Sequence, residues 1–307
     1  MACHIDIETF SEEDLKKAGT YRYAAHLSTE IMVVCYQFDD GPVHVWIPPN
    51  AAWDPELVEE MDIVGTEPVE QFPEEALPRP ERMTPGAKLH LQTECPDDLR
   101  LHAEIGGEFR AWNALFERTL LNGPAGKAIG FPATPIEQWM CVMAKAQAAS
   151  LPAALEHAAN ACGTHKKDKA GGKTMLQVAK PRNPSKKDPD VRWYINKHPD
   201  KYRTLYEYCI DDVLAEADLD RYIPELPPQE VAAYHLDQTI NDRGVKVDMP
   251  AIEDTMFLVD EYKELLAAKC LEWTGLRPSQ NEKLGAWVRD YYDIENLQAP
   301  TIREVLK

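Results

Sequence analysis

Two acidic residues near the start of the chain are its first candidate functional residues. Segment 4–10, HIDIETF, alternates isoleucine with polar residues, a pattern that predicts a β-strand. Residues i and i+2 of a strand point to the same face, so we expect Asp6 and Glu8 to lie side by side. Two carboxylates this close repel each other, and a divalent cation between them removes the repulsion. The pair alone fits an ordinary solvated strand face better than a metal site.

Two further pairs of polar residues stand four positions apart on predicted helices. Asn113 and Glu117 begin one helix, and Tyr208 and Asp212 lie within another. Side chains four residues apart share a helical face, so each pair projects together. Asp211 is rotated by about 100° from its neighbour, which makes Asp212 the preferred acid. Each pair alone also fits a helix cap or a helix surface.

Together, these four carboxylates and the tyrosine predict a site for two Mg²⁺ or Mn²⁺ ions. Hard divalent cations prefer oxygen ligands. Two such ions roughly 4 Å apart can clamp a phosphodiester, activate a water and stabilise the leaving oxygen. The tyrosine hydroxyl can orient that water. The neighbouring His4 is expected to point away from the acids.

The elements that must position these residues indicate an α/β domain that ends near residue 222. Three strands are predicted at 4–10, 30–38 and 43–47, as an antiparallel meander. A strand at 108–112 leads into a helix at 114–121. Strands followed by a strand–helix unit and then by helices are typical of α/β or α+β domains. Further helices are predicted at 96–106, 134–150, 151–163 and 202–223.

Three segments differ from this pattern. Residues 48–96 are rich in Pro and Glu and are interpreted as an excursion with a short helix at 55–61. Residues 164–203 form a basic loop region. Residues 223–307 are a second, helical module, in which a helix, a turn at 242–244 and a short strand precede a long helix at 250–275. A last helix is expected to begin at an N-cap on Ser279. The chain ends without a closing element, which fits a fragment.

Composition narrows the class of protein. The 307 residues carry a net charge of −19, which alone disfavours nucleic acid as a partner. The charge is uneven, however: residues 54–82 hold ten acids and two bases, whereas residues 166–203 hold twelve bases and four acids. The seven scattered cysteines predict reduced thiols. No signal peptide or long apolar run is visible, so a cytoplasmic protein is expected.

The order D-x-E, N-x₃-acid, Y-x₃-D resembles the Exo I, Exo II and Exo III motifs of DnaQ-like (DEDDy) 3′→5′ exonucleases. Those enzymes have an RNase H-like fold, a mixed sheet flanked by helices. The segments GTYRYAAHLSTEIMVVCYQFDD, SLPAALEHAANACGTHKKDKAGGKTM and YCIDDV resemble the exonuclease domain of phage-type family A DNA polymerases. INDRGVKVD and the following helices resemble the start of the polymerase thumb. The resemblance covers nearly the whole chain.

This resemblance implies an exonuclease domain over 1–222 and a thumb-like segment over 223–307. The implied reaction is proofreading hydrolysis at DNA 3′ ends with two Mg²⁺ or Mn²⁺ ions. Glu8 and Tyr208 would position the attacking water, and Glu117 stands where most relatives have Asp. The implied metal ligands are Asp6, Glu8, Glu117 and Asp212. The implied substrate contacts are Asn113, Thr9, Phe10, Lys166, Lys167, Lys169 and Lys173.

The implied partners are a single-stranded or frayed DNA 3′ end and, further, a polymerase domain or replication proteins, in the cytoplasm of a bacterial host. The gene would belong to a phage or a prophage. Polymerase activity is not expected, because no palm-domain acids follow the thumb-like part. Two alternatives stay open: an RNA 3′→5′ exonuclease of the same fold, and a non-catalytic domain that binds DNA or scaffolds a polymerase. The sequence leaves the preferred metal, the oligomeric state and the effect of Glu117 open.

Overall fold

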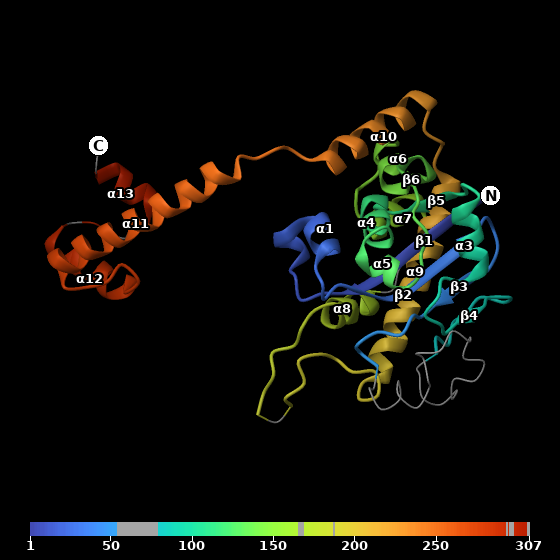
Figure 1. The fold of residues 1–307 in the computed structure, drawn as a ribbon, viewed down its shortest axis with the longest axis horizontal. Helices are drawn as coiled ribbons and strands as arrows, with labels where there is room; N and C mark the ends of the chain where they lie inside the picture. Colours follow the sequence, from blue (N-terminus) through green and yellow to red (C-terminus); the bar gives the residue numbers. More distant parts are fainter. Residues whose placement is uncertain (54–78, 165–168, 187, 293, 295–297, 306–307) are drawn as a thin grey trace. The chain divides into compact units, whose positions relative to one another are not determined.

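The computed structural model describes residues 1–53, 79–164, 169–186, 188–292, 294 and 298–305. These residues form two compact units, 1–243 and 244–307 (Figure 1). The candidate residues that the structure describes all belong to the first unit. The predicted helix at 55–61, Lys166 and Lys167 lie outside the described residues.

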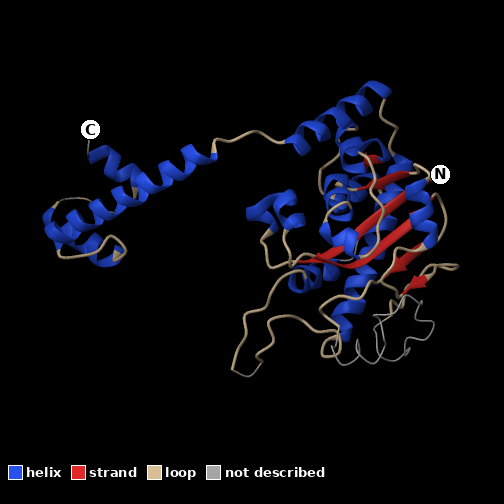
Figure 2. Ribbon diagram, in the orientation of Figure 1, coloured by secondary structure: helices blue, strands red, loops and turns tan. Residues whose placement is uncertain are grey.

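A mixed sheet is the centre of the first unit, shown in red in Figure 2. Within the described residues its strands lie in the order β4-β3-β2-β1-β5-β6. The predicted antiparallel meander of β1, β2 and β3 is confirmed, whereas β5 pairs with β1 in parallel. The strands are β1 (Ala2–Phe10), β2 (Glu30–Phe38), β3 (Val43–Trp46), β4 (Leu89–His90), β5 (Glu108–Ala111) and β6 (Trp139–Cys141).

Helices cover both faces of the sheet, so its central strands are apolar on both sides. On β2, Val34 packs in a core with Leu99 of α3 and Leu120 of α4. Its neighbour Val33 packs in a second core with Tyr206 of α9. The helices of this unit are α1 (Leu15–Ala25), α3 (Asp97–Glu104), α4 (Ala114–Leu121), α5 (Pro124–Ala128), α6 (Val142–Ala148), α7 (Leu155–Cys162), α8 (Lys169–Val178), α9 (Pro199–Tyr222) and α10 (Pro228–Arg243), with a 3₁₀ turn, η1, at Ile136–Gln138.

The single helix predicted over 134–150 is wrong. The segment instead forms η1, then strand β6, then α6. Residues of β6 pair in parallel with β5, Phe109 opposite Trp139, and the two rings stack with centroids 4.9 Å apart. Pairing at the edge of the sheet therefore overrides the local helix preference of this segment.

The second unit consists of α11 (Met249–Thr274), α12 (Asn281–Tyr291) and α13 (Ala299–Val305). The strand predicted after the turn at 242–244 does not form in the described residues, and the N-cap of α12 is Gln280 rather than Ser279. The compact first unit extends to Arg243 and so includes α10, twenty-one residues beyond the boundary expected at 222. No described helix has the length and apolar character that spanning a membrane requires.

Candidate active site

Asp6 and Glu8 of β1 and Asp212 of α9 form an acidic triad. One carboxylate oxygen from each residue lies within 4.8 Å of the others. Alternation along β1 explains the arrangement, because Ile5 and Ile7 pack into the core opposite α9. The acids must then face α9, where Cys209 donates from Sγ to the Asp6 carbonyl at 3.5 Å. The structure thus brings the first and third predicted motifs together.

A pocket of about 520 Å³ joins the triad to the second predicted motif. Asn113 is the N-cap residue of α4, and Glu117 lies in the first turn of that helix. Both side chains reach the pocket together with residues from β1, α7, α8 and α9. The pocket is lined by Asp6, Trp112, Asn113, Glu117, Ala154, Leu155, Glu156, Gly172, Tyr208, Asp212 and Glu216.

Glu117 is a buried acid of this pocket. Its side chain is buried, and its Oε2 atom accepts no hydrogen bond from any described residue. Burial raises the pKa of Glu117 well above its ordinary value, and the charge of Asp6 raises it further. A buried carboxyl group beside other acids is stabilised in its ionised form by a cation. This orphaned oxygen and the all-oxygen donor set fit Mg²⁺ or Mn²⁺ held by Asp6, Glu8, Glu117 and Asp212.

Tyr208 stands one helical turn before Asp212, as predicted, and lines the same pocket. Burial, followed by the charge of Asp212, raises the pKa of its phenol, so the hydroxyl keeps its proton. Two glycines of α8 lie against its ring. A Cβ atom added at Gly171 would lie 2.5 Å from Cδ2 of Tyr208, whereas one at Gly172 would make an ordinary 3.6 Å contact.

The remaining predicted substrate contacts lie elsewhere. Thr9 is buried with its hydroxyl 2.9 Å from that of Tyr23, and Phe10 is buried beneath the Arg192 guanidinium. Neither residue lines the pocket. Lys169 is the first residue of α8, and Lys173 is exposed on the same helix. Substrate contact by these residues stays a prediction.

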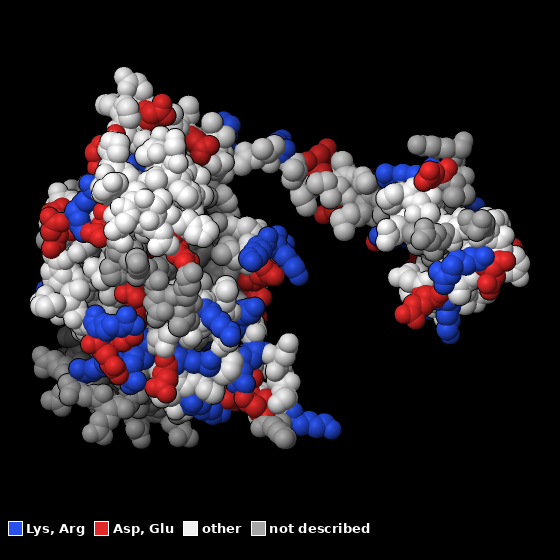
Figure 3. Space-filling view, turned by 180° about the vertical axis from the view of Figure 1, so that it is seen from behind, with Lys and Arg blue, Asp and Glu red and all other residues white. Residues whose placement is uncertain are grey.

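Many bases of the predicted basic region form ion pairs in the described structure. Figure 3 shows Lys and Arg side chains interleaved with Asp and Glu on the first unit. Several bases of this region pair with acids, which reduces their net field. The pairs are Arg182–Asp188, Lys197–Asp190, Arg192–Glu30 and Arg203–Asp200.

The expectation that His4 points away from the acids is wrong, because residues 4, 6 and 8 share one strand face. His4 Nδ1 lies 2.9 Å from Oε1 of Glu216 on α9. Glu216 itself was missed, although it continues the four-residue spacing of Tyr208 and Asp212. Extending that spacing by one turn would have found it.

A second group of potential ligands, His44, His90 and Asp98, lies at the β4 edge of the sheet. Several of its polar atoms form hydrogen bonds with protein groups. The hydroxyl of Tyr36 donates to Asp98 Oδ1 at 2.8 Å and lies 3.2 Å from His90 Nε2. The backbone N–H of Lys88 donates to His44 Nδ1 at 3.1 Å, which leaves the proton of a neutral ring on Nε2. These hydrogen bonds explain the group as a polar network that closes the sheet edge.

The chain is similar to part of a bacteriophage DNA polymerase. That protein is the DNA polymerase of Bacillus phage SP02, with 28% identity over 309 aligned positions. The alignment covers 99% of this chain and 41% of the phage polymerase. The chain therefore spans less than half the length of this relative. No protein-family model matches the chain.

Proposed function

We propose that this chain is a metal-dependent 3′→5′ exonuclease of the proofreading type, with an RNase H-like fold, that acts on DNA ends. The observation that carries the proposal is the meeting of Asp6, Glu8 and Asp212 within 4.8 Å, beside a pocket that Glu117 and Tyr208 also line. The similarity to a phage DNA polymerase supports DNA as the substrate and replication in a bacterial host as the setting.

In the proposed hydrolysis, different side chains of the pocket have different roles. When bound, two divalent cations would neutralise the charge that develops on the phosphate and make the attacking water more acidic. Asp6, Glu8, Glu117 and Asp212 would hold them. Tyr208, protonated and next to Asp212, is placed to orient the water by a hydrogen bond. Asn113 lies beside these acids and offers an amide for the substrate or for Glu117.

The neighbouring acids Asp212 and Asp211 provide the sharpest test. Asp211 is paired with Arg82 at 3.7 Å and does not line the pocket. Purified Asp212→Asn and Asp211→Asn proteins would each receive a 5′-labelled single-stranded DNA oligomer with Mg²⁺, Mn²⁺ or EDTA. We expect the wild type and Asp211→Asn to shorten the DNA from its 3′ end, and Asp212→Asn to be at least about 100-fold slower. Equal rates for the two variants would refute the assignment.

A matched RNA oligomer separates the two nuclease alternatives, because sugar discrimination depends on the 2′-hydroxyl. Faster shortening of RNA than of DNA would replace our substrate assignment. If neither oligomer is shortened but both divalent ions bind in calorimetry, the chain is a binding or scaffolding domain. The orphaned Glu117 oxygen favours ion binding over a purely structural role.

A further inference from the structure

Glu216 is a further acidic residue that lines the candidate pocket. It lies one turn after Asp212 on α9, so Tyr208, Asp212 and Glu216 project from the same side of the helix. Its side chain is almost completely buried and lines the pocket with Asp6 and Glu117. Burying a carboxyl group in this position is costly unless it has partners, so its contacts need an explanation.

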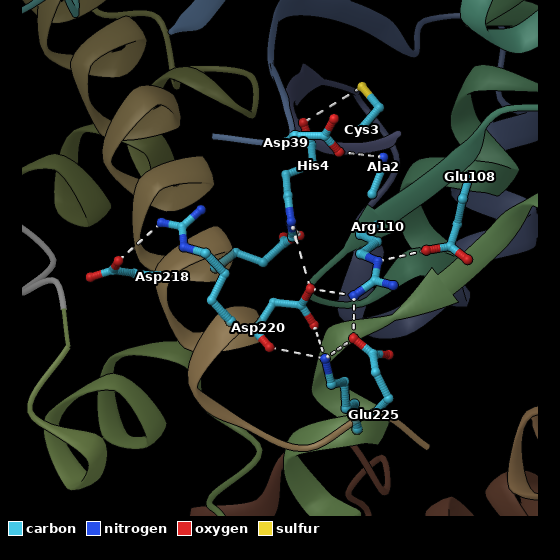
Figure 4. Close-up of polar contacts among 12 residues, drawn as sticks. Ala2, Cys3, His4, Asp39, Glu108, Arg110, Asp218, Asp220 and Glu225 are labelled. Carbon is cyan, nitrogen blue, oxygen red and sulfur yellow. Dashed lines mark hydrogen bonds and ion pairs between the residues drawn. The ribbon is translucent and has the colours of Figure 1, made fainter. Parts of the chain in front are cut away.

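A buried polar network that includes His4 and Asp220 lies on the side of Glu216 away from the pocket. His4 Nδ1 lies 2.9 Å from Oε1 of Glu216, and His4 Nε2 lies 3.6 Å from Oδ2 of Asp220. Asp220 is held by Arg110 at 2.5 Å and by the fully buried Lys145 at 2.7 Å. Figure 4 shows His4, Asp220 and Arg110 converging with Glu225. This network holds His4 in place, and the contact with His4 therefore fixes the Glu216 side chain at the pocket.

The pocket side of Glu216 faces other acids. Burial raises the pKa of Glu216 well above its ordinary value, and the charge of Glu117 is the next cause. Glu117 in turn has a buried Oε2 atom without a described hydrogen-bond partner. Two buried carboxyl groups therefore line one pocket, and the lining residues of that pocket include no Lys, Arg or His. A divalent ion near Glu117 would satisfy both.

We propose that Glu216 is a positioning residue of this metal pocket, fixed by His4, whose carboxylate strengthens binding of the ion that Glu117 holds. The inference rests on the proposed function, because it takes the pocket to be an ion site. It also gives the longer Glu117 a role. A side chain one methylene longer than Asp lets the Glu117 carboxylate reach further into the pocket that Glu216 also lines.

The test is Mn²⁺ binding to the full chain by isothermal titration calorimetry, with Glu216→Gln against Glu225→Gln. Glu225 belongs to the same buried network, yet its side chain is 62% exposed and does not line the pocket. We expect Glu216→Gln to weaken one Mn²⁺ binding step by about 10- to 100-fold and Glu225→Gln to leave both steps unchanged. The Mn²⁺ concentration for half-maximal nucleotide release should rise in parallel, with the rate at saturating Mn²⁺ changed only a few-fold.

Unchanged Mn²⁺ binding by Glu216→Gln, or equal weakening by Glu225→Gln, would overturn the inference. Glu216→Asp, which keeps the charge but withdraws it by one methylene, should bind the weakened ion with intermediate affinity. It serves as the second variant if the Gln protein does not fold. A wild-type chain that binds no Mn²⁺ would overturn the proposed function as well. If the wild-type chain cleaves DNA and Glu216→Gln binds Mn²⁺ as the wild type does, only the role of Glu216 is overturned.

Discussion

Arg118 of α4 binds Asp242 of α10 through two parallel hydrogen bonds, Nη1 to Oδ2 at 2.7 Å and Nη2 to Oδ1 at 2.8 Å. Tyr21 donates a third, at 2.7 Å, to the same carboxylate. Arg118 directly follows Glu117, so α10 is anchored one residue from a candidate metal ligand. This pairing explains why the first compact unit extends through α10.

Removing Asp242 should therefore loosen α10. Asp242→Ala leaves the guanidinium of Arg118, whose side chain is 8% exposed, without its bidentate partner. We expect a loss of about 1.5–3 kcal/mol in the free energy of unfolding, measured by urea denaturation. Amide exchange in α10 should quicken. Glu230→Ala, at an exposed site on the same helix, is the control. A loss of the same size in the control would argue against the anchor.

The two glycines of α8 should respond differently to the same added methyl group. Gly171→Ala places a Cβ 2.5 Å from the Tyr208 ring, so the ring must move, whereas Gly172→Ala makes only ordinary contact. Misplacing Tyr208 should slow nucleotide release by about 10- to 100-fold in Gly171→Ala, because general acid–base groups need exact placement. Gly172→Ala should stay within a few-fold of wild type. Equal rates for the two variants would show that Tyr208 does not orient the water.

The Asp212 carboxylate should lower the stability of the metal-free protein and raise the stability of the metal-bound protein. Without metal, Asp212→Asn removes a charge that repels Asp6 and Glu8, so its melting temperature should exceed that of the wild type. Saturating Mn²⁺ should reverse the order, since binding at 100 times Kd stabilises by about 2.7 kcal/mol. Differential scanning calorimetry with Mn²⁺ and with EDTA tests both halves. A wild-type transition that ignores Mn²⁺ contradicts the metal site.

The buried Lys145–Asp220 pair should make stability depend on acid pH. Burial alone would raise the pKa of Asp220, but the hydrogen bond from Lys145 and the charge of Arg110 outweigh it and lower the pKa. A lowered carboxyl pKa contributes stability above the ordinary Asp value of 3.8, and this stability is lost as the pH falls through the folded-state pKa.

Lys145→Met removes that contribution and leaves a buried carboxylate with fewer partners. We expect a cost of about 3–5 kcal/mol near neutral pH and a flatter decline of the urea midpoint below about pH 5. Lys127→Met, at an exposed site on α5, controls for the loss of one positive charge. Parallel curves of urea midpoint against pH for wild type and Lys145→Met would mean that the lowered pKa of Asp220 does not depend on this lysine.

The sequence by itself determined the local arrangement of the site. Asp6 and Glu8 share a face because side chains of a strand alternate, and Tyr208 and Asp212 share a face because a helix repeats every 3.6 residues. The meander of β1, β2 and β3 follows from the β-branched and aromatic residues of these strands and from the turn at 39–42. These features depend on backbone geometry over a few residues, which the order of residue types fixes.

Only the tertiary structure decided what meets across the chain. Strand β6 exists because β5 offers it an edge to pair with, although the segment favours a helix. His4 and Glu216, 212 residues apart, form a buried pair, and no local pattern predicts that these two residues meet. The basic region is partly neutralised by Glu30 and Glu81, which the fold brings beside Arg192 and Arg203. Such contacts depend on which surfaces are buried together, because burial sets the strength of charges and hydrogen bonds, and spacing along the sequence does not encode it.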